Sequence, residues 1–320
     1  MNDNLFQVTK EGKSGFINDK GQVVIDLVFD GVSSFSEGLA RIFVGGKVGY
    51  IDIKGNIKIQ PKFETASEFS EGLAYATEGD KYGYIDNTGE FVIKPEFYSC
   101  HDFENGYALV MQEVTSKGCF IDKFGAIKLN GRNFLVSKYS EGLINCSDNG
   151  DWGFIDINGN FIIPPTYKYT REFSEGKAAV SPKKINGKAN RKELYAFINK
   201  DNDIIIPPLF TGADIRFSDG MCAVWDKGYG YIDSTGQLVI PCYLYLGQHF
   251  SEGLAVVKEN GKGKGYGYID KTGAMVIKPT FTLAESFENG LAAVTIGKKY
   301  EEFKHGYIDK SGNYVWEPTR

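Results

Sequence analysis

The stretch Gly83-Tyr84-Ile85-Asp86 decides the fold, because variants of it recur along nearly the whole chain. With Phe in place of Tyr, Asn in place of Asp, or Cys or Ala in place of Gly, the phrase also begins near residues 15, 49, 119, 153, 196, 230, 267 and 306. Successive copies are 34, 34, 36, 34, 43, 34, 37 and 39 residues apart. Such a period is typical of a modular array whose units pack on their neighbours. We therefore predict a single repeat array over residues 1–320, with units starting near these positions and a partial last unit.

Residues 72–106 illustrate the expected fold of one unit. Three short segments rich in β-formers, 73–76, 82–86 and 91–93, are predicted to be strands separated by turns. Asp86 and Gly89 suit a type I turn followed by a bulge. We expect Pro95 to end the third strand, and the polar stretch between Phe97 and Phe103 to form one helical turn. The sequence thus predicts an all-β tandem array of about nine three-stranded antiparallel meander units.

The array could be open or closed. The chain begins at the second strand of a unit and ends just past a third strand, so pairing of the two ends could close a ring. Uneven repeat spacing and poorly matched terminal segments favour an open curved solenoid instead. The alternative is a closed propeller-like ring.

The bulk composition excludes several functional classes. The 320 residues carry a net charge of −5, which argues against a nucleic-acid partner. The polar N-terminus lacks the pattern of a secretory signal, and no apolar run reaches the roughly 20 residues of a membrane span. The five cysteines form no CxxC pair and are best explained as free buried thiols in a reducing compartment. We therefore expect a cytoplasmic location and no membrane span.

Almost all length variation falls in one segment of the repeat. From the phrase to the glycine of the next Ser-Glu-Gly turn, such as Ser70-Glu71-Gly72, there are 23 residues in seven repeats and 24 in one. From that glycine to the next phrase the distance varies between 10 and 20 residues. These variable segments are the hairpin tips between the first and second strands. Insertions in repeat proteins collect on one face, which is often the binding face.

The longer tips are rich in basic residues, so we hypothesise that they contact another protein with an acidic surface. The alternative is that long loops simply carry lysine for solvation. The candidate partner-binding residues are Lys183, Lys184, Lys188, Arg191 and Lys192 in the longest tip, Lys262 and Lys264 in another, and Lys298, Lys299 and Tyr300 in a third.

No catalytic, metal-binding or cofactor-binding residues are predicted. Each Asp-x-x-Gly turn offers a single carboxylate, which suits turn capping better than calcium binding. The repeated Tyr and Phe could form a sugar-stacking or choline-binding ladder, but one aromatic per strand at a fixed register is more typical of a core between units. The three histidines, His101, His249 and His305, stand at non-equivalent positions, and no nucleophile, phosphate-loop or dinucleotide motif is present. We therefore expect that the protein is not an enzyme and needs no cofactor.

The repeat resembles the WG-repeat family, also written KWG. Residues 266–292 carry the pattern almost complete, from Tyr266-Gly267-Tyr268-Ile269-Asp270 through Pro279 to Gly290-Leu291-Ala292. The Trp-Gly pair that names the family survives only at Trp152-Gly153. The resemblance covers about residues 12–318. It implies a bacterial β-repeat protein without family catalytic residues, and some similar proteins resemble immunity or antitoxin proteins.

These observations favour a non-catalytic protein-interaction scaffold that binds through its variable hairpin tips, and the family resemblance suggests an immunity or antitoxin type. The alternative is a protein that binds a glycan or cell-wall ligand through exposed aromatic side chains.

Overall fold

The computed structural model describes residues 4–114, 118–130, 135–214, 216–258 and 265–319. They form β-strands and one short 3₁₀ helix, η1 (Tyr300–Glu302), with no α-helix in the described ranges. The chain divides into two compact units. The first comprises Met1–Cys146 and Asp156–Asn160, and the second comprises Ser147–Ile155 and Phe161–Arg320.

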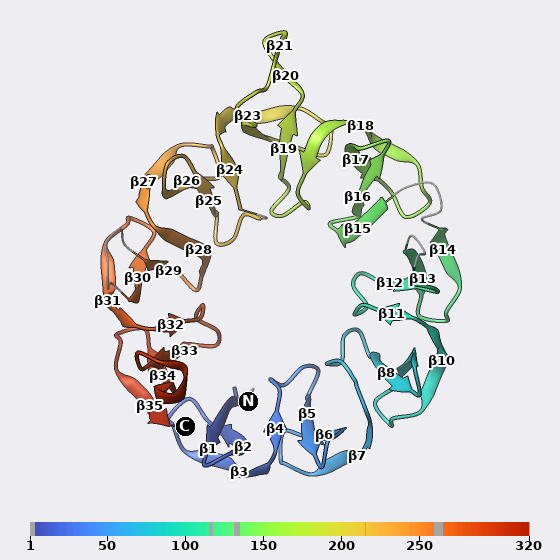
Figure 1. Ribbon diagram of the computed structural model, residues 1–320, viewed down its shortest axis with the longest axis vertical. Helices are drawn as coiled ribbons and strands as arrows, with labels where there is room; N and C mark the ends of the chain where they lie inside the picture. Colours follow the sequence, from blue (N-terminus) through green and yellow to red (C-terminus); the bar gives the residue numbers. More distant parts are fainter. Residues whose placement is uncertain (1–3, 115–117, 131–134, 215, 259–264, 320) are drawn as a thin grey trace. The chain divides into compact units, whose positions relative to one another are not determined.

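The strands of the first unit run in chain order through successive small sheets (Figure 1). They are β1 (Phe6–Lys10), β2 (Lys13–Ile17), β3 (Val23–Phe29), β4 (Gly31–Val32), β5 (Leu39–Val44), β6 (Lys47–Asp52), β7 (Ile57–Phe63), β8 (Ala74–Glu78), β9 (Lys81–Ile85), β10 (Phe91–Phe97), β11 (Ser99–Cys100), β12 (Tyr107–Met111), β13 (Cys119–Asp122), β14 (Ile127–Asn130) and β15 (Leu135–Ser140). Strand β16 (Leu143–Asp148) contains the boundary between the units.

The second unit repeats the same order of strands. They are β17 (Asp151–Ile155), β18 (Phe161–Thr170), β19 (Ala178–Pro182), β20 (Lys184–Ile185), β21 (Lys188–Ala189), β22 (Tyr195–Ile198), β23 (Ile204–Phe210), β24 (Gly212–Ala213), β25 (Met221–Trp225), β26 (Tyr229–Asp233), β27 (Leu238–Leu244), β28 (Leu246–Ser251), β29 (Leu254–Lys258), β30 (Tyr266–Asp270), β31 (Met275–Phe281), β32 (Leu283–Ala284), β33 (Leu291–Ile296), β34 (Lys304–Asp309) and β35 (Tyr314–Thr319).

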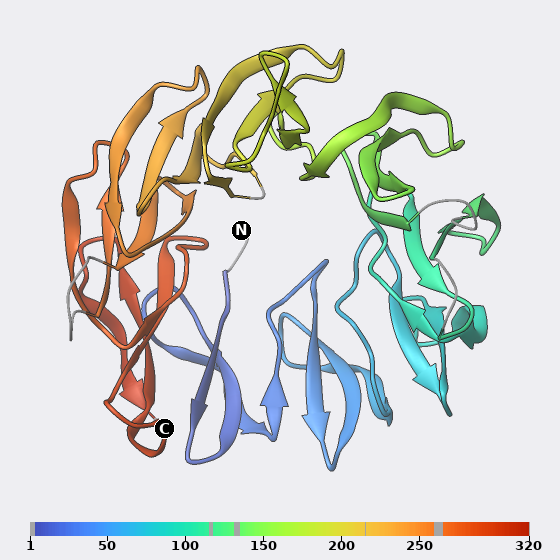
Figure 2. The same cartoon turned by 45° about the horizontal axis from the view of Figure 1, so that its top comes forward.

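The expected antiparallel meander is present, but most sheets contain one strand more than the sequence predicted. Among the described residues, the sheets β4-β5-β6-β7, β11-β12-β13-β14, β24-β25-β26-β27, β28-β29-β30-β31 and β32-β33-β34-β35 have four strands. The added strand comes first in each and, apart from β28, is only two residues long. Within the second unit, β24, β28 and β32 lie on the inner side of the arc of sheets, and β27 and β31 lie on its outer side (Figures 1 and 2).

The added strand also corrects two expectations. The stretch between Phe97 and Phe103 forms β11 and not a helical turn. Pro95 does not end the third strand, because β10 continues through it to Phe97. The paired residues Phe97 and Ile93 are four positions apart on β10, whereas their partners Tyr82 and Tyr84 are only two positions apart on β9. The extra residues of β10 form a bulge at the proline. Proline is tolerated there because a bulge leaves an N–H that is not needed for the ladder.

The same bulge explains the glycine of the repeated phrase. In the preceding repeat, a Cβ atom on Gly49 would lie 2.5 Å from the carbonyl oxygen of Ile59 and 2.6 Å from the nitrogen of Pro61. A side chain at this position would therefore push the bulged strand away from β6.

The Asp-x-x-Gly turns fold as predicted. Oδ1 of Asp52 accepts hydrogen bonds from the backbone N–H groups of Lys54 and Asn56, both at 2.9 Å. Gly55 has a φ of +82°, which is the conformation that glycine provides at such a turn. Asn18 makes the equivalent bonds to Lys20 and Gln22 at 3.0 Å, so the turn does not depend on the charge.

The Ser-Glu-Gly turns join one repeat to the next. Glu37 has a φ of +53°, in the left-handed region, and its carboxylate accepts hydrogen bonds from the N–H groups of Glu71 (2.6 Å) and Gly72 (2.8 Å) in the following turn. The hydroxyl of Ser36 donates to the carbonyl of Phe69 at 2.6 Å. Equivalent carboxylate bonds run from Gly106 to Glu71, from Gly253 to Asp219 and from Gly290 to Glu252.

The core lies between consecutive sheets. The fully buried ring of Tyr50 packs on Phe69, with ring centroids 4.9 Å apart, and the same cluster includes Ala76 and Ile85 of the next sheet. The tyrosine hydroxyl donates a 2.6 Å hydrogen bond to the carbonyl of Ser67. The same bond is made by Tyr84 to His101, Tyr231 to Gln248 and Tyr268 to Glu285. The prediction that the repeated aromatics form the core between units is confirmed for these rings.

All five cysteines are free thiols, as the sequence suggested. Cys100, Cys119, Cys146 and Cys222 are buried, and Cys242 is partly buried. Burial raises the pKa of the Cys100 thiol to about 12, so this group is a packing element and not a reactive thiolate at neutral pH.

Candidate binding surfaces

The longest tip is a built hairpin and not an irregular loop. Strands β20 and β21 pair Lys184 with Ala189 and Ile185 with Lys188. The two residues between them, Asn186 and Gly187, have φ values of +48° and +77°, as in the tight turns that suit two-residue hairpins.

Asn190 anchors the base of this hairpin. Its Nδ2 donates to the carbonyls of Pro182 and Leu194 at 2.9 Å, and its Oδ1 accepts from the N–H of Leu194 at 2.9 Å. These bonds tie the two ends of the insertion together where it leaves the sheet. The hairpin is therefore held as a defined projection from β19 and β22 (Figure 1).

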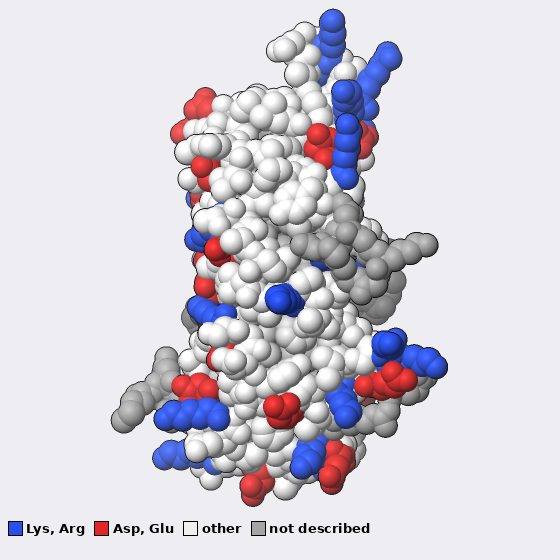
Figure 3. All heavy atoms as spheres, turned by 90° about the vertical axis from the view of Figure 1, so that its left-hand side faces the viewer, with Lys and Arg blue, Asp and Glu red and all other residues white. Residues whose placement is uncertain are grey.

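The basic residues of this tip are exposed and gather in one place. Figure 3 shows Lys and Arg side chains clustered at the end of the molecule where β20 and β21 lie. Lys183 forms an ion pair with Asp151. No ion pair is found within the described ranges for the other four, which are Lys184, Lys188, Arg191 and Lys192. Four of the five basic residues predicted in this tip are therefore exposed cations that have no counterion among the described residues.

The other two predicted tips contribute fewer described basic residues to a candidate binding surface. Lys262 and Lys264 lie outside the described residues. Lys298, Lys299 and Tyr300 are exposed beside η1, and Tyr300 is 84% exposed. They lie in the connection between β33 and β34, whereas β20–β21 extends from the sheet that contains β19 and β22.

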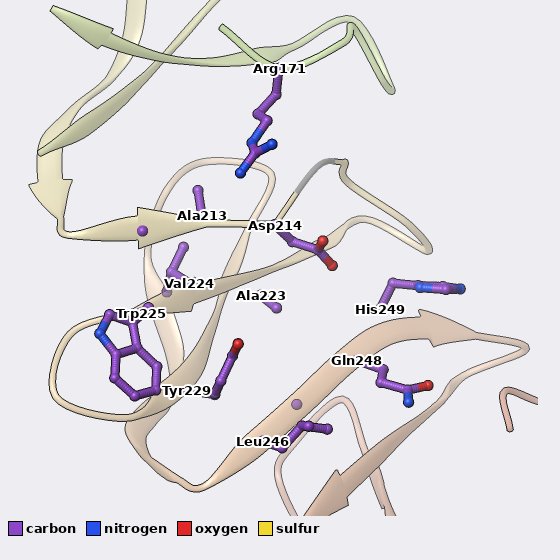
Figure 4. Close-up of a pocket in the computed structure, with 12 residues that line it drawn as sticks. Arg171, Ala213, Asp214, Ala223, Val224, Trp225, Tyr229, Leu246, Gln248 and His249 are labelled. Carbon is purple, nitrogen blue, oxygen red and sulfur yellow. The ribbon is translucent and has the colours of Figure 1, made fainter. Parts of the chain in front are cut away.

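A second candidate surface, which the sequence did not indicate, is a groove of about 540 Å³ in the second unit. It lies between the sheet β24–β27 and strand β28 (Figure 4). The exposed Trp225 and the partly exposed Tyr229 line one part of it, with ring centroids 5.0 Å apart. Arg171, Asp214, Gln248 and His249 line the other part.

The repeat brings the polar residues of the groove together. Arg171 and Asp214 occupy equivalent positions in their repeats. The backbone N–H of Arg171 donates to the carbonyl of Ala179 at 2.8 Å, and that of Asp214 donates to the carbonyl of Ala223 at 2.8 Å; both acceptors lie in the first strand of their repeat. Gln248 stands five residues before its turn glycine, as Arg171 does. Three consecutive repeats therefore present a cation, an anion and an amide from one structural position.

This position explains why the groove was missed. Other repeats place Ser33, Ser67, His101 and Glu285 there, so no shared motif marks it. The only local signal is Gly247, where a Cβ atom would lie 2.5 Å from the hydroxyl oxygen of Tyr231. A side chain at Gly247 would displace the tyrosine that holds Gln248 in place.

Among the residues that the structure describes, no group of three or more His, Cys, Asp or Glu side chains is placed to hold a metal ion. Within those same ranges, no helix is long and apolar enough to cross a membrane.

Comparison with solved structures identifies the fold. The chain is similar to the crystal structure of a eukaryotic initiation factor, with a TM-score of 0.66 and 10% identity over 99% of this chain and 98% of that one. Weaker similarities, with TM-scores of 0.44 and 0.35, are to AztD from Citrobacter koseri (13% identity; 99% and 93% covered) and to streptogramin B lyase (14% identity; 98% and 97% covered). These similar structures are β-propeller-like folds. At such identities the likeness concerns the fold alone.

A search of curated proteins finds no match. The model of the WG containing repeat, in contrast, matches seven segments that together cover well over half of the sequence: residues 15–47, 49–82, 82–113, 152–188, 195–224, 229–262 and 266–300. The chain therefore belongs to the WG-repeat family.

Proposed function

We propose that the protein is a non-catalytic interaction module that binds an acidic surface of another protein through the β20–β21 hairpin. The observation that carries this proposal is the set of four exposed cations on one anchored projection, none of which has a counterion among the described residues. Basic groups already fixed on a hairpin lose less conformational freedom on binding than groups on a mobile loop. An immunity or antitoxin protein is the form of such a module that the family suggests.

The electrostatics support an acidic partner in spite of the net charge of −5. A local cluster acts over about one Debye length, roughly 8 Å at physiological salt, so the hairpin presents a positive field to an approaching surface. Such a field accelerates association and makes binding sensitive to salt.

Affinity capture of the tagged protein, followed by quantitative mass spectrometry, tests the proposal. The informative variant reverses four charges, K184E, K188E, R191E and K192E, and leaves the Lys183–Asp151 pair intact. A matched control reverses four exposed lysines elsewhere, K20E, K54E, K94E and K278E. We expect the hairpin variant to lose the captured partner and the control to keep it. Equal capture by both variants would contradict the proposal.

For the array as a whole, we propose the closed propeller-like ring. The support is the similarity, over nearly the full length, to a β-propeller-like fold, and it reverses the preference for an open solenoid that repeat spacing suggested. About nine units remains a prediction. Small-angle scattering tests the closure, because an open array of the same mass has a larger maximum dimension than a ring.

A further inference from the structure

We propose that the groove between β24–β27 and β28 binds an uncharged saccharide. The site is separate from the β20–β21 hairpin and does not depend on the proposed protein interaction. Its volume of about 540 Å³ lies within the range of pockets that bind small molecules.

The aromatic part of the groove supplies a stacking surface. Trp225 is 39% exposed and Tyr229 is partly exposed, whereas rings such as Tyr50, Tyr84 and Tyr231 are fully buried in the core. The two rings face each other across β25 and β26 in a T-shaped arrangement. In the described part of the chain, neither the indole N–H nor the tyrosine hydroxyl has a hydrogen-bond partner, so each is available to a ligand. An amphipathic ring of this kind suits a ligand with apolar faces and polar edges, which is the character of a sugar ring.

The polar part supplies both kinds of hydrogen-bonding group. The guanidinium of Arg171 donates only, and it has no ion pair or hydrogen bond to another described residue. The carboxylate of Asp214 accepts only, and the side-chain amide of Gln248 does both. Figure 4 shows Arg171 extending from the neighbouring repeat toward the segment that carries Ala213 and Asp214, with Gln248 and His249 on β28. Sugar hydroxyls donate and accept at once, so a polyol can bond both to donors and to acceptors of this lining.

The charge of the lining selects among ligands. Apart from His249, one cation and one anion line the groove, and their charges cancel. A charged ligand would gain from one of these groups and be repelled by the other, whereas an uncharged polyol bonds to both. The groove therefore favours a neutral saccharide over an anion, a cation or a charged peptide.

Isothermal titration calorimetry against defined neutral trisaccharides (maltotriose, cellotriose, chitotriose and xylotriose) tests the proposal, with tri-galacturonic acid and a trilysine peptide as charged comparisons. We expect at least one neutral trisaccharide to bind with a Kd below 10 mM. Trp225→Ala and Arg171→Ala should each weaken binding at least tenfold, and Trp225→Phe should stay within about threefold of the parent. Tyr98→Ala removes an exposed ring outside the groove and should leave binding unchanged.

Circular dichroism melts establish that each variant is folded before its affinity is compared. The absence of binding by all four neutral sugars at 10 mM overturns the proposal. Binding only by the charged comparisons also overturns it, as does neutral-sugar binding that Trp225→Ala leaves intact.

Discussion

Replacing Tyr50 by Phe should cost the protein about 2 kcal/mol of stability. The ring is fully buried, and its hydroxyl donates a 2.6 Å hydrogen bond to the carbonyl of Ser67, a residue that is itself only 4% exposed. Phenylalanine keeps the ring and its contact with Phe69, so the change isolates the hydrogen bond. Leaving a buried acceptor unpaired costs about 1–3 kcal/mol. Burial raises the pKa of Tyr50 far above its ordinary value, so the hydroxyl remains a donor throughout the neutral pH range.

The measurement is urea unfolding followed by circular dichroism, with hydrogen exchange read by mass spectrometry over the peptide that contains Ser67. Tyr82→Phe is the matched control, because Tyr82 lies in the corresponding region of a neighbouring sheet, is partly exposed, and its hydroxyl has no partner among the described residues. It should change stability by less than about 0.5 kcal/mol. If the two variants lose the same stability, or if exchange at Ser67 is unchanged, the hydrogen bond from Tyr50 to Ser67 does not stabilise the contact between repeats.

Three further changes test other parts of the repeat. Burial disfavours the charged form of Asp52, but hydrogen bonds from Asn56 and its neighbours outweigh this effect and lower the pKa of the carboxyl to about 2. The contribution of Asp52 to stability is therefore complete above about pH 4 and is lost as the pH falls toward 2, a loss of about 1–2 kcal/mol. Asp52→Asn should abolish this loss, which urea titrations at pH 5 and pH 2.5 measure. Glu252→Ala removes the acceptor for the Gly290 N–H and should lower the melting temperature, whereas Glu252→Gln, which keeps an acceptor, should lower it less; equal losses would refute a role for the carboxylate bond. Gly83→Val places side-chain atoms against the bulged strand and should destabilise by more than 3 kcal/mol, which a thermal melt within 3 °C of the parent would contradict.

The elements that repeat could be predicted from the sequence. Gly-Tyr-Ile-Asp marks a strand and a turn in each copy, so the meander, the Asp52-type turns and the buried tyrosines follow from periodicity and turn chemistry. The prediction failed at β11 because a strand of two residues is too short to show alternation. It failed at Pro95 because a bulge accommodates proline inside a strand, which propensity alone does not indicate.

The candidate sites also differ in how far the sequence predicts them. The basic tip was visible because length variation and charge coincide in one segment, although sequence could not indicate that β20 and β21 pair or that Lys183 is neutralised by Asp151. The groove was invisible because its residues are the ones that differ between repeats. Arg171 and Trp225 are more than fifty residues apart in the sequence and line the same groove only in the folded array.

The turn carboxylates bear on how the chain folds as it leaves the ribosome. Glu37 adopts a left-handed backbone that costs a residue with a side chain about 1–2 kcal/mol, and the bonds that offset this cost come from a turn made 34 residues later. At this turn a newly synthesised repeat lacks those bonds until its successor has been translated. We therefore expect each unit to gain stability when the next one emerges, so that folding follows the order of synthesis.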